Sequence, residues 1–462
     1  MRKGYGKQVT KERKKSLGIF IAILLFFLGT LVLYGIGIYN DSEQYIMMHI
    51  HREPLYPLFL AFFRLLAGPE AGLVLAVIVQ NVFAACSIFF LIEYLTKKFS
   101  LHLTGELVLL ALELAPHLVT RYVSALGIFL ENSIMSEALC IPLFQCFLLF
   151  TLRMIFEKKK RDMAWSLVFA YLLSMTRGQM MTTILIWLIV VFCLFLFERQ
   201  YRKLLIPAAA VLCVFGFRSL TVHTYNFFVN GYFMGNTYGQ VNTLTNVIYA
   251  CDREDGEVFE EGSLERRFFD IFYEEADALM ANYRYAENAP EGEAAYLEAH
   301  HDTLKFEVLE SNLSAYYFGL GKVDYYQQSR MSDEMAGKML KKLLPACFGQ
   351  WLYDYLLLCR NGFIRSIAVV NRWINWAALA IYLAAAALTI RILLKDKKSG
   401  AARVMGLALL FIAANVCATS LTIMCLSRYM IYGFSIFYMA FFLLTVEFVR
   451  GKQRPGRPSG RV

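Results

Sequence analysis

The sequence predicts an all-α polytopic membrane protein: a bundle of about ten transmembrane helices with a small helical extracytoplasmic insertion. Composition is the first observation behind this prediction, because the 462 residues are 58% hydrophobic and 18% charged, with a mean hydropathy of +0.47. Soluble domains carry about 25% charged and about 45–50% apolar residues. The second observation is that apolar residues fall in runs near the ~20 residues that span a bilayer. The third is that basic residues gather beside these runs.

Ten apolar runs approach the spanning length, and an even number places both chain ends on one side. The first run follows a basic segment but is long enough to span, so we expect a retained helix rather than a cleaved signal peptide. The expected spans are 17–38, 71–95, 103–120, 134–152, 163–179, 180–197, 204–222, 373–394, 404–426 and 429–449.

The distribution of Lys and Arg predicts the orientation of these spans. Of the 46 basic residues, 27 lie in the tails and loops on one side, and five lie in the short segments on the other. Cytoplasmic loops are enriched in Lys and Arg. We therefore expect a multi-pass membrane protein with both termini in the cytoplasm and no nucleic-acid partner.

Residues 223–372 interrupt the apolar pattern and hold 22 of the 37 acidic residues. By alternation of the spans they face the outside. Segments 263–285 and 332–344 show helical periodicity with acidic starts, which predicts a mostly helical domain. The expected organisation is thus an N-terminal membrane module over 1–222, this extracytoplasmic domain, and a C-terminal membrane module with a basic tail over 373–462.

The stretch after the first run carries the most chemistry. Asp41 and Glu43 form an acidic pair, His49 and Arg52 follow eight and eleven residues after Asp41, and Tyr56 lies in a Pro-x-x-Pro turn. A solvated loop can have the same composition. The order of an acidic pair, basic groups and an interfacial apolar helix favours a functional site.

Arg177 has a separate physical argument. The apolar run before it, Met163–Met175, is about 20 Å of helix against a hydrocarbon core of about 30 Å. An Arg below the membrane surface costs at least about 2.5–3.5 kcal/mol unless a polar partner faces it. A lipid phosphate is such a partner, and snorkelling of the Arg to the interface is the alternative.

The third run contains a polar row. Glu113 and His117 lie one helical turn apart, and Arg121 follows them. This row is either a structural cluster or part of a substrate site. Glu137, at the start of the fourth run, is either a site residue or an acid that interacts favourably with the helix dipole. Arg428, beside Tyr429 at the start of the last run, either contacts phosphate or sugar or is a membrane-flanking anchor.

Taken in order, these motifs resemble the GT-C glycosyltransferases, in particular the bacterial relatives of the protein O-mannosyltransferases and the lipid A aminoarabinose transferase. The resemblance covers roughly residues 17–220, and a large insertion after the seventh span is similar to the mannosyltransferase arrangement. The matching stretches are the acidic pair at 41 and 43, Arg52-Glu53-Pro54-Leu55-Tyr56-Pro57-Leu58, Asn132-Ser133-Ile134-Met135-Ser136-Glu137, Thr176-Arg177-Gly178-Gln179 and Ser427-Arg428-Tyr429.

The resemblance implies an inverting, single-displacement transfer of a sugar from a polyprenyl-phosphate donor to a lipid, glycan or protein acceptor on the extracytoplasmic face. Asp41 is then the catalytic base, with Glu43 as the alternative. A departing phosphate is a stable anion that needs nearby cations rather than an acid. The expected substrate-binding residues are His49, Arg52, Tyr56, Arg121, Glu137, Arg177, Arg428 and Tyr429.

The sequence leaves open whether a divalent cation is bound and which of three functions the protein has. No nucleotide or dinucleotide motif is present, and the carboxylates of Asp41 and Glu43 suit Mg²⁺ or Mn²⁺, so a divalent cation is an alternative to a metal-free site. An O-antigen-type polymerase or ligase would be expected to centre its Arg and His in the large loop. A transporter or lipid flippase tends to show two related halves.

Overall fold

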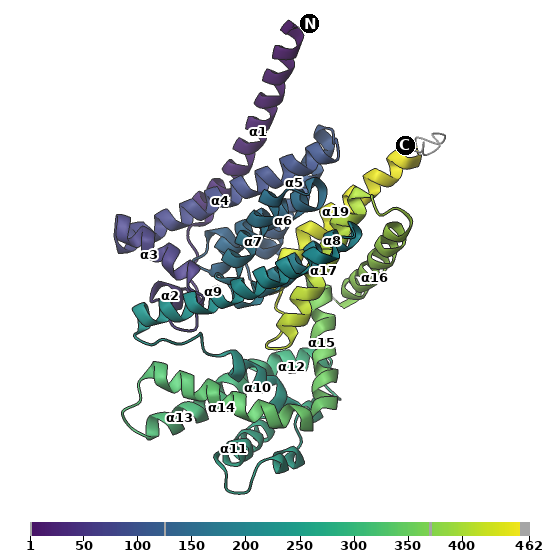
Figure 1. Cartoon of the computed structure of the whole chain (residues 1–462). Coiled ribbons are helices and arrows are strands. Elements are labelled where there is room, and N and C mark those ends of the chain that lie inside the picture. Colours follow the sequence, from purple (N-terminus) through teal and green to yellow (C-terminus); the bar gives the residue numbers. More distant parts are fainter. Residues whose placement is uncertain (1, 124–125, 369–371, 453–462) are drawn as a thin grey trace. The chain divides into compact units, whose positions relative to one another are not determined.

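The computed structural model describes residues 2–123, 126–368 and 372–452. Over these ranges the chain is helical and forms no strand, although one backbone bridge joins Gly37 to Ser133. The chain divides into two compact units, each described by itself. Figure 1 labels their helices. Unit 1 holds Met1–Leu220, Ser366–Ala414 and Ser427–Val462, and unit 2 holds Thr221–Arg365 and Asn415–Leu426.

Nine helices within the described ranges are long and apolar enough to cross a membrane, so the chain is a multi-pass helical membrane protein. Each overlaps one of the expected spans. They are Arg13–Tyr34 in α1 (Arg2–Tyr34), α4 (Pro69–Lys98), α5 (Leu103–Tyr122), α6 (Ser136–Glu157), Gly178–Phe197 around α8 (Thr182–Phe197), Tyr201–Asn230 around α9 (Leu205–Asn230), Trp376–Lys395 in α16 (Arg372–Lys395), α17 (Gly400–Ser420) and Tyr432–Arg450 in α19 (Tyr432–Lys452).

The expected span at 163–179 differs. It forms α7 (Lys160–Ser174), whose 15 residues give about 22 Å of helix and do not reach the spanning length. Asp162 near its start pairs with Arg153 near the end of α6 at 3.1 Å. Beyond its other end, Arg177 pairs with Glu137 at the start of α6 at 2.6 Å. Helix α7 therefore runs antiparallel along α6, and α6 and α8 begin at the same end of the bundle.

Two short helices follow α1 and carry the chemistry-bearing loop. Helix α2 (Asn40–Ile46) leads into the apolar α3 (Leu55–Ala67), which is too short to span. Gly68, with φ +87, ends α3 and begins the turn into α4. A Cβ on Gly72 would lie 2.4 Å from Cα of Arg64, so only glycine lets α3 and α4 pack this closely. This packing holds the loop against the bundle.

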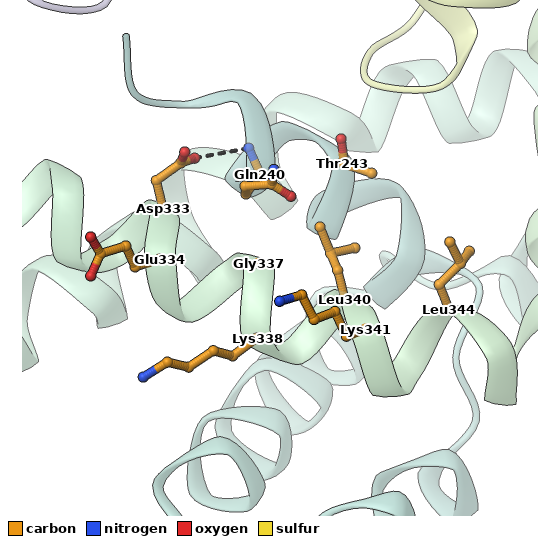
Figure 2. Close-up of a pocket in the computed structure, with 9 residues that line it drawn as sticks. All are labelled: Gln240, Thr243, Asp333, Glu334, Gly337, Lys338, Leu340, Lys341 and Leu344. Carbon is orange, nitrogen blue, oxygen red and sulfur yellow. Dashed lines mark hydrogen bonds between the residues drawn. The ribbon is translucent and has the colours of Figure 1, made fainter. Parts of the chain in front are cut away.

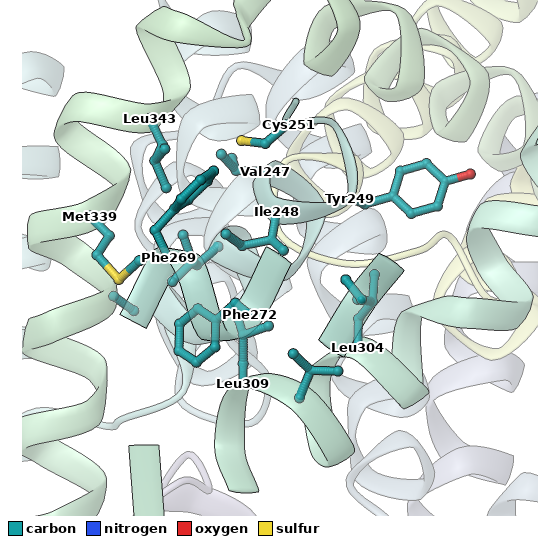
Figure 3. Packing of buried hydrophobic residues seen from close by; sticks show 14 of the residues in the cluster. Val247, Ile248, Tyr249, Cys251, Phe269, Phe272, Leu304, Leu309, Met339 and Leu343 are labelled. Atoms are coloured by element: carbon teal, nitrogen blue, oxygen red, sulfur yellow. The ribbon is translucent and has the colours of Figure 1, made fainter. Parts of the chain in front are cut away.

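Unit 2 surrounds one hydrophobic core. Figure 3 shows Phe269, Phe272, Leu304 and Met339 meeting in it, and each is fully buried. Burial of such a side chain stabilises the fold by roughly 1.5–3 kcal/mol. The helices of this unit are α10 (Gly239–Tyr249), α11 (Leu264–Ala278), α12 (Glu293–Asp302), the π-helical stretch η6 (Thr303–Glu310), α13 (Ser311–Gly319), α14 (Tyr325–Ala346) and most of α15 (Phe348–Ile367).

The two helical segments expected in this region are present with different limits. Helix α11 ends at Ala278, before a separate turn at Tyr283–Tyr285. Helix α14 begins seven residues before the expected start at Ser332. Its cap is Asp324, whose carboxylate accepts hydrogen bonds of 2.9 Å from the amides of Tyr326 and Gln327. A capping carboxylate satisfies amides that have no partner within the helix, which sets the true start.

Candidate functional site

The backbone after α1 is tied to the backbone before α6. The Gly37 amide donates to the Asn132 carbonyl at 3.0 Å, and the Gly37 carbonyl accepts from the Ile134 amide at 2.9 Å. These bonds bring the loop that carries Asp41 beside the segment that carries Glu137. Two stretches about 100 residues apart in the chain thus contribute to one site.

Asp41 lies on α2 between two guanidinium groups. Nη2 of Arg52 is 2.7 Å from its Oδ1, and Nη1 of Arg428 is 3.3 Å from its Oδ2. Arg52 is itself oriented by a hydrogen bond to Gln44 (2.9 Å) and by the ring of Tyr45, whose centroid is 4.7 Å away. The first loop and the start of the last helical segment therefore share one carboxylate.

Glu137 and Arg177 form a second ion pair, with 2.6 Å between Oε2 and Nη1. Nη1 of Arg177 also donates to the Ser136 hydroxyl at 3.0 Å, and that hydroxyl hydrogen-bonds to the Tyr45 hydroxyl at 2.8 Å. Nε of Arg428 lies 4.0 Å from Oε1 of Glu137. The two ion pairs are therefore continuous. We call Asp41, Arg52, Glu137, Arg177 and Arg428 the arginine–carboxylate cluster.

Tyr429 lies between two of the three arginines. Its ring centroid is 5.0 Å from the guanidinium carbon of Arg177 and 5.0 Å from that of Arg428. The carbonyl of Tyr429 accepts from Nε2 of Gln179 at 3.2 Å. Contacts between guanidinium groups and an aromatic ring are favourable and fix the planes of both arginines.

The cluster carries a surplus positive charge, since three guanidinium groups face two carboxylates. Its two ends differ in access: Glu137 is 1% exposed and Arg177 12%, whereas Asp41 is 28% and Arg428 23% exposed. An anion can therefore approach Asp41 and Arg428 and meet uncompensated positive charge. Such preorganised cations stabilise an oxyanion most strongly where water is excluded.

The charge state of Asp41 follows from its neighbours. Burial alone would raise the pKa of this carboxyl group, but the positive charges of Arg52 and Arg428 outweigh burial and hold the pKa below its ordinary value. Asp41 is therefore ionised at neutral pH. A carboxylate in this state can accept a proton, and its basicity increases if an incoming anion draws the arginines away.

A further ion pair joins Arg218 of α9 to Glu53 of the first loop. Nε of Arg218 also donates to the Ser174 carbonyl at 3.4 Å. Gly178 packs beside this pair, because a Cβ there would lie 3.3 Å from Oε1 of Glu53. Arg218 was not among the expected site residues, although a lone Arg within the expected span 204–222 is the signal that identifies it.

Of the expected site residues, Asp41, Arg52, Glu137, Arg177, Arg428 and Tyr429 come together. Tyr56 lies beneath them, fully buried, with its ring 5.2 Å from that of Tyr45 and its hydroxyl 3.4 Å from Oε1 of Gln80. It supports Tyr45. His49 lies beside His51, with ring centroids 5.8 Å apart.

Glu43 and Arg121 are directed elsewhere. The Glu43 side chain is exposed, because residues two apart on a helix such as α2 face different sides. Arg121 donates to the Gly127 carbonyl at 2.6 Å and lies 5.0 Å from the ring of Tyr34. The other two residues of the polar row on α5 have partners outside that row. His117 bonds to Glu131, and Glu113 bonds to Gln145.

The same helix geometry bears on a divalent cation. Asp41 and Glu43 cannot converge on one ion from α2, and Asp41 already bonds two arginines. Within the part of the chain that the structure describes, no three His, Cys, Asp or Glu side chains are grouped to hold a metal. The donor set at Asp41 therefore does not fit Mg²⁺ or Mn²⁺.

Unit 2 contains an open groove between α10 and α14. Figure 2 shows its lining, with Asp333 on α14 directed at Gln240 on α10 and with Lys341 further along α14. Oδ1 of Asp333 accepts from the Gln240 amide at 2.8 Å and from the Val241 amide at 3.2 Å. Asp333 thereby satisfies free amides at the start of α10, which is a structural role.

Comparisons with models of known protein families, with curated proteins and with solved structures find no match to this chain.

Proposed function

We propose that this protein transfers a sugar from a polyprenyl-phosphate donor to an acceptor on the extracytoplasmic face of the plasma membrane. The single observation that carries the proposal is the convergence of Arg52, Arg177 and Arg428 on the carboxylates of Asp41 and Glu137. This inventory matches the needs of the reaction: cations for a departing phosphate and an ionised carboxylate to accept a proton.

In the proposed step, the donor phosphate binds at the exposed guanidinium of Arg428 and beside Arg177. The acceptor hydroxyl oxygen attacks the anomeric carbon, and the bond from that carbon to the phosphate oxygen breaks. The phosphate oxygen keeps the electron pair, and the hydroxyl proton passes to Asp41. Inversion follows because the hydroxyl and the phosphate occupy opposite faces of the sugar.

In the absence of a donor, the carboxylate of Asp41 compensates charge on the arginines that would bind the donor phosphate. Asp41 neutralises part of the positive charge of Arg52 and Arg428 before a donor arrives. A phosphate offers these arginines stronger, bidentate partners. When Arg428 turns to the phosphate, Asp41 loses one of its two positive neighbours and becomes a better base at the moment when it is needed.

The orientation rests on the positive-inside rule. Lys and Arg gather at 153–161 and 391–403, which would be cytoplasmic, whereas 223–372 are rich in acids. Because α7 returns the chain along α6, it counts as a crossing beside the nine long helices of the described ranges. The number of crossings is then even, and both termini would be cytoplasmic. Reporters at Lys158 and Lys397 should be cytoplasmic, and one at Asp270 extracytoplasmic. A cytoplasmic reporter at Asp270 would contradict the proposed site.

The direct test uses the purified protein in lipid nanodiscs with a panel of polyprenyl-phosphate sugars, each with and without candidate hydroxyl acceptors. The expected result is release of polyprenyl phosphate from one donor, accelerated by one acceptor. Binding of donors with no release from any of them would instead favour a lipid flippase. Consumption of polyprenyl-diphosphate oligosaccharides alone would favour an O-antigen-type polymerase or ligase.

A further inference from the structure

Unit 2 contains a cluster of polar side chains that the proposed reaction does not use. Nζ of Lys305 lies 3.6 Å from Oε1 of Glu310, and the Tyr238 hydroxyl donates to Oε2 of Glu310 at 3.2 Å. Lys305 also lies 4.8 Å from the ring centroid of Tyr238. The side chains of Lys305 and Glu310 are 13% and 18% exposed, so both are largely buried but remain partly accessible to solvent. We call it the Tyr238–Lys305–Glu310 cluster.

The backbone that carries Lys305 and Glu310 has an uncommon conformation. Both residues lie on the π-helical stretch η6 (Thr303–Glu310), between α12 and α13. In an α-helix with 3.6 residues per turn, residues five apart point to different sides. In a π-helix the backbone hydrogen bonds join residues five apart. This conformation is rare in proteins as a whole, and where it occurs it is often at a functional site. Here it brings the ammonium and the carboxylate onto one face.

Tyr238 also has an unusual backbone conformation. Its φ of +81 lies in the left-handed region, which residues other than glycine rarely adopt. Such a residue costs on the order of 1–3 kcal/mol and persists where its surroundings hold it. Two and three residues further on, the amides of Gln240 and Val241 donate to the Asp333 carboxylate. Figure 2 shows the first of these two bonds. This conformation accompanies the placement of the Tyr238 hydroxyl on Glu310.

Aromatic rings border the cluster. The ring centroid of Phe306 is 4.5 Å from Nζ of Lys305, and Phe306 is 50% exposed. Tyr325, 42% exposed, hydrogen-bonds to Tyr238 through its side chain. Binding sites for small molecules combine apolar or aromatic walls with a few placed polar groups. This cluster has both kinds of group in contact with one another.

Two amide side chains lie on α10, the helix that Tyr238 precedes. Asn242 and Asn246 are four residues apart, so they share one face of that helix. Asn246 is buried, and neither atom of its amide has a hydrogen-bond partner among the described residues. Buried polar atoms without a hydrogen-bond partner are uncommon in folded proteins, so the Asn246 amide is a candidate to bond a ligand or a water molecule.

The charges select the class of ligand. The ammonium of Lys305 and the carboxylate of Glu310 compensate each other, so neither an anion nor a cation gains net attraction. The pair nevertheless offers donors and an acceptor, and the aromatic rings offer apolar faces. A sugar ring has hydroxyl groups at its edge and C–H groups on its faces, and it carries no charge.

We propose that unit 2 binds a neutral saccharide at the Tyr238–Lys305–Glu310 cluster. The sugar hydroxyls bond to Glu310 and Lys305, and the ring packs on Phe306 or Tyr325. Identification of this saccharide as the acceptor of the transfer reaction rests on the proposed function. The binding itself does not.

The test measures saturation-transfer NMR signals from neutral hexoses, N-acetylhexosamines and their short oligomers with the full-length protein in nanodiscs. Inorganic phosphate and choline serve as anionic and cationic probes. At least one saccharide should bind, and Glu310→Gln or Lys305→Met should weaken that binding by about tenfold or more, as expected for the loss of hydrogen bonds to a charged group. Saccharides without signal, or binding of phosphate or choline alone, would overturn the proposal.

Matched variants separate a binding role from a structural one. Glu334→Gln removes the carboxylate of an exposed ion pair with Arg330, and Tyr285→Phe removes an exposed hydroxyl, so both should leave binding unchanged. Phe306→Ala removes a half-exposed ring with little risk to folding and should also weaken binding. Equal effects of Glu310→Gln and Glu334→Gln would contradict the assignment.

The proposed function fails separately. Asp41→Asn should leave saccharide binding largely unchanged, because the contacts proposed for the saccharide are all made by residues of unit 2. If saccharides bind at the cluster but no polyprenyl-phosphate donor is consumed, the saccharide site stands and the transferase proposal fails. If a donor is consumed while Glu310→Gln changes neither binding nor the acceptor KM, the saccharide site fails alone.

Discussion

Arg428 and Asp41 are 387 positions apart in the sequence, yet Nη1 of Arg428 donates a hydrogen bond of 3.3 Å to Oδ2 of Asp41. The loop after the first span and the segment before the last are thereby joined through one carboxylate. Because Arg428 also lies 4.0 Å from Glu137, the same guanidinium connects the accessible and buried parts of the cluster.

Asp41→Asn should lower turnover by about 10²–10⁴-fold, because the amide keeps the shape but cannot accept the proton. Donor binding should be largely retained. Glu43→Gln is the matched control, since Glu43 lies two residues away with an exposed side chain. Turnover and donor affinity are measured for both proteins. Normal turnover in Asp41→Asn with a loss in Glu43→Gln would transfer the role of base to Glu43.

Arg428→Gln should weaken donor binding by about 10- to 100-fold through loss of charged hydrogen bonds. It should also move the acid limb of the pH–rate profile to higher pH, because Arg428 contributes to the lowered pKa of Asp41. Arg121→Gln is the control, since its guanidinium bonds to Gly127 and contacts Tyr34. An unshifted profile for Arg428→Gln would separate Arg428 from the base.

Arg177→Met should destabilise the protein by about 3–5 kcal/mol, because it leaves the carboxylate of Glu137 buried without its cation. Adding Glu137→Gln should recover much of this loss. A double-mutant cycle on thermal unfolding measures the coupling. Additive effects of the two changes would show that the pair is not coupled, and they would make loss of donor binding in Arg177→Met a direct consequence of the missing guanidinium.

Asp354→Asn should stabilise unit 2 at alkaline pH. Burial raises the pKa of Asp354 to about 7, and Gln350 bonds to one of its oxygens at 3.0 Å. The folded state therefore keeps a proton that the unfolded state releases, and the free energy of unfolding falls between about pH 4 and pH 7, by up to about 4 kcal/mol.

Melting temperatures at pH 5 and pH 8, followed through the fluorescence of nearby Trp351, check this expectation. The wild-type protein should lose more stability between these values than Asp354→Asn. The exposed Glu307→Gln should behave like the wild type. An equal loss in wild type and Asp354→Asn would mean that Asp354 does not titrate in this range.

The π-helical stretch marks the limit of sequence periodicity in unit 2. Lys305 and Glu310 are five residues apart, a spacing that an α-helical reading assigns to different faces. The cluster that they form with Tyr238 had no sequence signal for this reason. For Asp41 and Glu43 the sequence could not decide which side chain faces the site. The helical conformation of α2 decides it, because it directs the two side chains to different sides.

The sequence by itself determined the membrane class and nearly all of the spans, and it predicted the five residues of the arginine–carboxylate cluster and Tyr429 as site residues. It could do so because hydropathic runs and the charges beside them are local properties of the chain. Only the tertiary structure decided which charges meet. It paired Asp41 with Arg428 and Glu137 with Arg177, joined Arg218 to Glu53, gave His117 to Glu131 rather than to a row with Arg121, and turned the segment 163–179 into the short α7. The physical reason is that a buried charge takes its partner from whichever helix packs against it, and the packing of helices distant in the chain is not written in any local pattern.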